Sequence, residues 1–141
     1  MINTSTEPAS HTTPQLVLIV DDDAFSQDLL AEMLRALGIS DIHTASNGRI
    51  GLRTLAALPK PPDFLIVDVF MPDMDGIEFL AELAKNRYQG GIMLVSGQDI
   101  TMMAIAQQVA IAEGLQLLGA YTKPIPLDVL SETLALGTSI G

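Results

Sequence analysis

Three short runs of purely apolar residues constrain the fold of this chain more than any other feature of its sequence. Each run is four or five residues long, is built mainly from Val, Ile and Leu, and leads directly into a polar residue: Leu16–Val20, Phe64–Val67 and Ile92–Val95. Runs of this length and composition are typical of strands buried on both faces of a sheet. A chain with several such strands must supply helices that cover both faces.

The segments between these runs carry apolar residues at helical spacing. The segment 24–37 is the clearest case, and Gly38 follows it at the position where helices commonly end. Strand and helix alternate five times along the chain, which predicts an α/β fold with a doubly wound, five-stranded parallel sheet and five helices. The other predicted helices are 47–58, 77–86, 100–113 (capped by Asp99) and 126–136, and the weaker strands are 42–45 and 115–121.

The predicted strands and helices form one domain over residues 16–137. Residues 1–15, rich in Thr, Ser and Pro, are expected to form a disordered leader, and residues 138–141 a C-terminal tail. No apolar run reaches membrane-spanning length, and the leader lacks the apolar core of a secretory signal. A membrane segment is therefore not expected.

The charge and composition of the chain exclude several kinds of partner. The formal net charge is −10, with 7 Lys and Arg against 17 Asp and Glu. So few basic residues argue against direct nucleic-acid binding and against anionic membrane surfaces. The absence of cysteine removes disulfides, thiolate metal sites and cysteine nucleophiles, and it fits a cytoplasmic protein.

Chemically active side chains stand at the ends of four of the five predicted strands. Because ligands bind outside the carboxyl ends of parallel strands, these side chains are expected to meet at one edge of the sheet. Alone, each has an ordinary explanation as a helix cap, a turn residue or a snorkelling lysine, but their joint placement indicates a site. They are Asp21, Asp22 and Asp23 after the first strand, Asp68 after the third, Ser96 after the fourth and Lys123 after the fifth.

These residue types suit phosphoryl chemistry that depends on a divalent metal. Carboxylates in contact cannot all stay ionised unaided, and Mg²⁺ binds carboxylate oxygens together with the phosphate oxygens of a substrate. A lysine and a serine beside the metal would bind further phosphate oxygens. Asp68 stands alone at the end of a central strand, and a carboxylate can act as a nucleophile that forms an aspartyl phosphate.

At these positions the chain resembles the receiver domain of two-component response regulators. The matching stretches are LIVDDDAFSQ, LIVDVFMPDMDG, LVSGQD and GAYTKPI, in family order and spacing, over roughly residues 15–136. The resemblance implies a flavodoxin-like fold with strand order 2-1-3-4-5 and a role in cytoplasmic phosphorelay signalling. It implies a signalling domain rather than an enzyme, one that catalyses only its own phosphotransfer and slow autodephosphorylation.

The resemblance also implies how the phosphoryl group is bound. Asp68 would accept it from the phosphohistidine of a histidine kinase or a phosphotransfer protein. Ser96 would hydrogen-bond the phosphoryl group and Lys123 would pair with it. The sequence given shows no output domain after the receiver, so two alternatives stay open: a single-domain regulator that docks a downstream effector, or a receiver that is part of a longer protein with an output domain.

The metal ligands implied by the resemblance are Asp22, Asp68 and the backbone carbonyl of Phe70, with Asp21 acting through a metal-bound water. Asp23 is left as the cap of the first helix. Phe70 and Gln98 flank the site where many relatives carry polar residues. A bulky Phe70 is expected to hinder the water that hydrolyses the acyl phosphate, which predicts a long-lived phosphoryl state.

The chain departs from the family pattern at the residue that usually carries the switch aromatic. That position, three residues before the lysine, is Ala120, and Tyr121 is expected to point to the opposite face of the sheet. We therefore expect the signal to travel through the loop after Ser96 and the helix that starts at Ile100.

The helix predicted over 100–113 is unusually apolar. Two interpretations stay open: a broad core face with a few exposed residues, or a docking or homodimer surface that includes Met102 and Met103. Together with Ala120 and Tyr121, these methionines form the predicted switch and output surface.

Two other classes of function compete with the phosphoacceptor switch. One is a degenerate receiver that docks proteins without phosphorylation, against which the intact Asp22, Asp68, Ser96 and Lys123 argue. The other is an enzyme on a similar sheet. An aspartyl-phosphate phosphatase typically needs a second acid two residues after the nucleophile, where this chain has Phe70. A flavodoxin needs a loop after the first strand that cradles phosphate, and here that loop is acidic.

Overall fold

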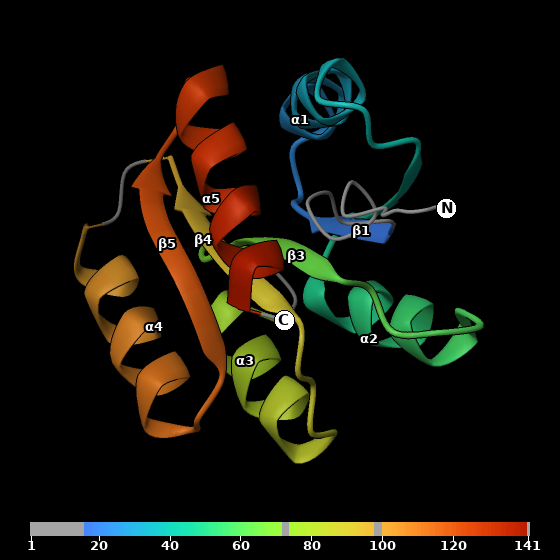
Figure 1. Cartoon of the computed structure of the whole chain (residues 1–141). Coiled ribbons are helices and arrows are strands. Elements are labelled where there is room, and N and C mark those ends of the chain that lie inside the picture. The colour runs from blue at the N-terminus through green and yellow to red at the C-terminus, as the bar shows by residue number, and fades with distance from the viewer. Residues whose placement is uncertain (1–15, 72–73, 98–99, 141) are drawn as a thin grey trace.

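A computed structural model describes residues 16–71, 74–97 and 100–140, with side chains up to residue 137 (Figure 1). The predicted leader, the cap at Asp99 and the flanking Gln98 lie outside the described residues. No helix within the described ranges is long and apolar enough to cross a membrane.

Five parallel strands form one sheet, and a helix follows each strand. The sheet order is β2-β1-β3-β4-β5, so the chain crosses over beside β1, as predicted for a flavodoxin-like fold. The strands are β1 (Leu16–Val20), β2 (Asp41–Ala45), β3 (Phe64–Asp68), β4 (Gly91–Ser96) and β5 (Gln116–Thr122). The helices are α1 (Ala24–Ala36), α2 (Gly48–Ala57), α3 (Gly76–Lys85), α4 (Ile100–Ala112) and α5 (Leu127–Ile140).

Two apolar layers hold the helices on the two faces of the sheet. Helices α1 and α5 cover one face, where Leu34 and Leu130 are fully buried against Ile19 and Ile66. Helices α2, α3 and α4 cover the other face, where Phe79 is fully buried in the second layer. Strands β1, β3 and β4 are buried along their whole length, which confirms the prediction from their apolar runs.

Short polar side chains cap the starts of α1 and α2. Asp23 accepts a hydrogen bond from the backbone of Phe25, and Asn47 accepts one from Ile50, as expected for residues that satisfy the free N–H groups of a first turn. Gly38 follows α1 with φ +94°, a left-handed conformation that glycine adopts without strain.

The last helix is longer than predicted. It continues to Ile140, so the predicted tail begins inside α5 rather than after it. The sequence predicts that this helix ends near Leu136. In the structure, Gly137 lets α5 lie close to β5, because an added Cβ would stand 2.8 Å from a methyl carbon of Leu118. This glycine therefore serves packing and does not end the helix.

A bulge in β5 decides which face its last residues meet. Ile92 pairs with Leu117 and Met93 pairs with Gly119, so Leu118 is the extra residue. The bulge resets the alternation of side chains. As a result Ala120 packs on the α4 side of the sheet and Tyr121 on the α5 side, which confirms the opposite facing predicted for this pair.

Candidate functional site

The acidic turn after β1 buries the first of its three consecutive aspartates and exposes the other two. Asp21 is fully buried, whereas Asp22 and Asp23 are exposed. One oxygen of Asp21, Oδ1, accepts a hydrogen bond of 2.9 Å from the backbone N–H of Asp23. The Asp23 carboxylate caps α1 through Phe25, as predicted, so it is engaged with the helix.

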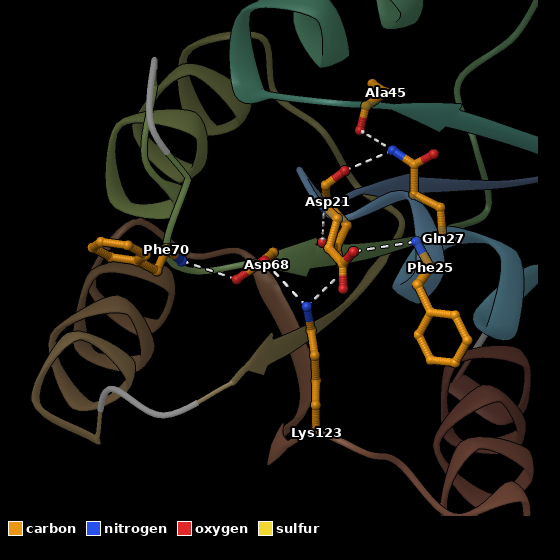
Figure 2. Close-up of polar contacts among 8 residues, drawn as sticks. Asp21, Phe25, Gln27, Ala45, Asp68, Phe70 and Lys123 are labelled. Carbon is orange, nitrogen blue, oxygen red and sulfur yellow. Dashed lines mark hydrogen bonds and ion pairs between the residues drawn. The ribbon is translucent and has the colours of Figure 1, made fainter.

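Asp68 ends the central strand β3 and is buried beside this turn. Its side chain is almost completely enclosed, and Oδ1 accepts a hydrogen bond of 3.0 Å from the backbone N–H of Phe70. Phe70 is 63% exposed, and its ring points away from Asp68 (Figure 2). The site therefore meets the backbone of Phe70 rather than its ring.

Lys123 joins the two buried acids from the far side of the site. Its Nζ lies 2.7 Å from Oδ2 of Asp21 and 3.2 Å from Oδ2 of Asp68 (Figure 2). The backbone N–H of Lys123 donates to the carbonyl of Ser96 over 2.8 Å, which fixes the end of β5 to the end of β4. Ser96 itself is buried at the end of β4. The four strand ends thus converge as the sequence predicted.

Burial and charge together raise the pKa values of both central groups, Asp68 and Lys123. Burial raises the pKa of the Asp68 carboxyl from 3.8 to about 6, and Asp21 adds to this shift, while Lys123 and the backbone of Phe70 oppose it. Burial alone would lower the pKa of Lys123, but its contacts with Asp21 and Asp68 outweigh burial and raise it. The lysine therefore stays charged when Asp68 titrates.

The three acids form a set that suits a hard divalent cation. Ligand oxygens of Asp21, Asp22 and Asp68 lie within 4.8 Å of one another. Oδ2 of Asp21 is buried and lies 2.7 Å from the ammonium group of Lys123. Carboxylate oxygens are ligands that Mg²⁺ prefers, so the residues present fit this ion.

The residues of the predicted switch surface separate in the structure. Ala120 contacts the layer beneath α4, whereas the hydroxyl of Tyr121 lies 3.1 Å from Oγ1 of Thr133 in α5. Met103 is buried against the core, which is the reverse of the exposure that a docking residue needs, and Met102 is partly buried. Met103 is therefore a core residue, because it lies on the face of α4 that meets the sheet.

The exposed apolar side chains of α4 are isoleucines rather than methionines. Ile100, Ile105 and Ile111 are exposed, and the helix carries no charged residue from Ile100 to Ala112. Because apolar residues lie on all sides of this helix, its sequence alone does not reveal the buried face.

Two polar residues near the site were not predicted from the sequence. Gln27 in α1 reaches back to the acidic turn, where its Nε2 lies 2.6 Å from the carbonyl oxygen of Asp21. Thr133 in α5 is buried and contacts Tyr121. The only available signal for Thr133 was a polar residue on the apolar side of a helix. Gln27 carried no signal, because polar residues are common in the first turn of an exposed helix.

Comparison with known proteins gives one consistent result across sequence and structure. The family model described as the response regulator receiver domain matches residues 17–135. The sensor histidine kinase RcsC of Salmonella typhimurium is 31% identical over 133 residues, which cover 94% of this chain and 13% of the kinase. The protein-glutamate methylesterase/protein-glutamine glutaminase of Treponema denticola is 37% identical over 92 residues, or 61% of this chain and 24% of that protein.

Solved structures give the same fold at comparable length. The chemotaxis protein CheY4 of Vibrio cholerae superposes with a TM-score of 0.71 and 27% identity, covering 87% of this chain and 98% of that one. The chain spans about a quarter or less of the length of the two curated relatives described above. Their shared region is therefore one domain of larger proteins.

Proposed function

This chain belongs to the response regulator receiver domain family of two-component signalling, and from that premise we propose that it is a switch phosphorylated on Asp68. Asp68 is the buried carboxylate at the end of the central strand, and it lies between a lysine and two further acids. The main support for the proposal is the position of the buried Asp68 carboxylate beside Lys123.

Asp68 acts as the nucleophile in the proposed reaction. One of its carboxylate oxygens attacks the phosphorus of a phosphohistidine, and the bond from phosphorus to the imidazole nitrogen breaks as the acyl phosphate forms. Lys123 is already charged and within 3.2 Å of Asp68, so it offsets the negative charge of the incoming phosphoryl oxygens. The hydroxyl of Ser96, at the neighbouring strand end, donates to a phosphoryl oxygen.

Mg²⁺ is the cofactor that the acids would hold. Asp21, Asp22, Asp68 and the backbone carbonyl of Phe70 would supply its protein ligands, with Asp21 acting through a bound water. When bound, the ion supplies positive charge that offsets the phosphoryl oxygens. The chain's own part is to keep three carboxylates close enough together that a cation is favoured over repulsion.

We expect the phosphorylated state to be read through α4 rather than through a rotating aromatic. Ala120 has no ring to rotate, and Tyr121 faces α5, where Thr133 lies 3.1 Å from its hydroxyl. Movement of the backbone after Ser96 would then shift the start of α4. A long-lived acyl phosphate stays a further proposal from the sequence, to which the ring of Phe70 adds no support because it points away from Asp68; a hydrolysis half-life of seconds would contradict it.

The partners follow from this role. The donor is a histidine kinase or a phosphotransfer protein, and the receiver passes its state to an effector or to an output domain. The uncharged exposed face of α4 is the proposed homodimer surface. Changing Ile100 and Ile111 together to Glu should abolish self-association in sedimentation experiments, and a wild type that stays monomeric at all concentrations removes the dimer proposal.

Intact-mass spectrometry after incubation with acetyl phosphate and Mg²⁺ tests the central proposal. The wild type should gain one phosphoryl group, and Asp68→Asn should gain none. If the wild type gains none while binding Mg²⁺, the chain is a degenerate receiver that docks proteins without phosphorylation.

A further inference from the structure

The side chain of Gln27 connects α1 to the ends of two strands. Its Nε2 donates to the carbonyl oxygen of Asp21 over 2.6 Å and to that of Ala45 over 3.3 Å (Figure 2). Gln27 lies in the first turn of α1, whose backbone starts at the same acidic turn, since its N–H donates to the carbonyl of Asp23 over 3.0 Å. One side chain thus joins α1, the end of β1 and the end of β2.

The two carbonyls that Gln27 binds belong to the backbone that holds the acids in place. The N–H of Asp21 donates to the carbonyl of Ala45 over 3.0 Å, so Ala45 anchors Asp21 both directly and through Gln27. A partly buried carbonyl without a partner is costly, and an amide that binds two of them limits rotation of the Asp21 peptide. Rotation of that peptide would displace the Asp21 carboxylate from Lys123, which lies 2.7 Å away.

We infer that Gln27 is a positioning residue, whose amide fixes the acidic turn so that the carboxylates of Asp21 and Asp22 face Asp68. The inference rests on the proposed function in that these carboxylates are taken to bind Mg²⁺. Among the described residues, the side-chain amide of Gln27 hydrogen-bonds the backbone carbonyls of Asp21 and Ala45, so it acts through the backbone of the turn. Outer-shell groups that hydrogen-bond metal ligands commonly change metal affinity by about 10- to 100-fold when they are removed, and we expect the lower end of this range for a contact made through the backbone.

Two substitutions of Gln27 distinguish its effect on the position of the acidic turn from an effect of charge near the site. Gln27→Met keeps the length of the side chain and removes the donor, so Mg²⁺ affinity should fall about tenfold. Gln27→Glu keeps the shape, replaces the donor by an acceptor and adds a negative charge close to the site. Charge alone would strengthen Mg²⁺ binding in this variant, whereas loss of the position should weaken it.

Asn86→Leu is the matched control. Asn86 also donates a side-chain amide to a backbone carbonyl, that of Glu82, over 2.8 Å, but it does so at the far end of α3. Its loss should lower stability in the same way as the loss of the Gln27 contact and leave Mg²⁺ affinity unchanged. A general loss of stability would therefore affect both variants, and a positioning effect only Gln27→Met.

The test is a titration of each intact protein with Mg²⁺, followed by the amide NMR signals of the acidic turn. The inference predicts weaker binding by about tenfold in Gln27→Met, weaker binding in Gln27→Glu, and wild-type binding in Asn86→Leu. Wild-type affinity in Gln27→Met, or tighter binding in Gln27→Glu, overturns the inference and leaves the phosphoacceptor proposal standing. A wild type that binds no Mg²⁺ overturns both.

Discussion

An aspartate lies at each end of β3, and the two carboxylates differ in their burial and in their contacts. Asp63, just before the strand, is exposed, and its Oδ2 accepts a hydrogen bond of 3.0 Å from the backbone N–H of Leu16. Its own N–H and carbonyl bond to Leu16 and Gly91, so it joins the starts of three strands. Asp68, at the other end, is buried, faces Asp21 and depends on Lys123 for compensation.

The comparison shows that aspartate has a structural role at the amino end of β3 and the proposed functional role at its carboxyl end. At the amino end, polar groups pair with the backbone: Tyr88 also donates its hydroxyl to the carbonyl of Pro62 over 3.1 Å, and burial with the charge of Asp63 raises the pKa of that tyrosine. These contacts stabilise the sheet. At the carboxyl end, like charges are held together at a cost in stability, which is typical of functional sites.

Removal of Lys123 should have the largest effect on the carboxyl end of β3. In Lys123→Met without metal at pH 7, Asp21 and Asp68 lose their cation, and the free energy of unfolding should fall by about 3–5 kcal/mol. Phosphorylation by acetyl phosphate with Mg²⁺ should slow by about 100-fold. Urea unfolding and the rate of mass gain measure the two effects.

The matched control for this experiment is Lys85→Met. Lys85 pairs with Glu82 over 3.2 Å on the exposed surface of α3, where such pairs contribute less than about 1 kcal/mol. If both lysine variants lose the same stability and keep the same phosphorylation rate, the site is not organised around Lys123.

The next largest effect is expected in the pH dependence of stability, through Asp68. The folded pKa of Asp68, about 6, lies above its ordinary value of 3.8, so the folded state holds this proton more tightly than the unfolded state. The resulting stability is present below about pH 4 and is lost as pH rises through about 6, a change of about 3 kcal/mol. Without metal, Asp68→Asn should lack this loss.

Urea unfolding at pH 4 and pH 7 measures the difference. The stability of Asp68→Asn relative to the wild type should improve by about 3 kcal/mol between these two values. A relative stability that does not change with pH would show that Asp68 is not held in a raised-pKa environment.

A change at the amino end of β3 should have a smaller effect, which falls on stability and not on phosphorylation. Asp63→Ala removes the acceptor for the N–H of Leu16 and should cost about 1–2 kcal/mol of stability. The phosphorylation rate should stay at the wild-type value, because Asp63 lies at the far end of β3. A large loss of phosphorylation in a variant that remains folded would show that the two ends are not independent.

The smallest effect is expected at the contact between β5 and α5. Tyr121→Phe removes the hydrogen bond to Thr133, which itself donates to the carbonyl of Val129 over 2.8 Å, and should cost about 1 kcal/mol. Phosphorylation should not change. In a double-mutant cycle with Thr133→Val, the two costs should not add, and strict additivity would mean that the two hydroxyls do not interact.

The sequence predicted the sheet and the centre of the site because both rest on local patterns. The apolar runs before Asp21, Asp68 and Ser96 identify buried strands, and parallel strands must bring their carboxyl ends together. The contacts of Asp21 and Asp68 with Lys123 follow from that rule, although the residues are far apart in the chain.

Other features depend on contacts that no local pattern encodes. The burial of Met103 is hidden because α4 is apolar on all sides, and the close approach of Gly137 to Leu118 appears only once α5 is placed against β5. The role of Gln27 is visible only once β1, β2 and α1 are placed together. Tertiary packing decides each of these, and the sequence alone does not supply it.

Chemical mapping of the phosphorylated residue tests the central claim most directly. The wild type is incubated with acetyl phosphate and Mg²⁺ and then treated with hydroxylamine, which converts an acyl phosphate to a hydroxamate on the same side chain. Peptide mass spectrometry then locates the modified residue. The account predicts a hydroxamate on Asp68 and none on Asp63. A hydroxamate on another acid, with Asp68 unmodified, would contradict it.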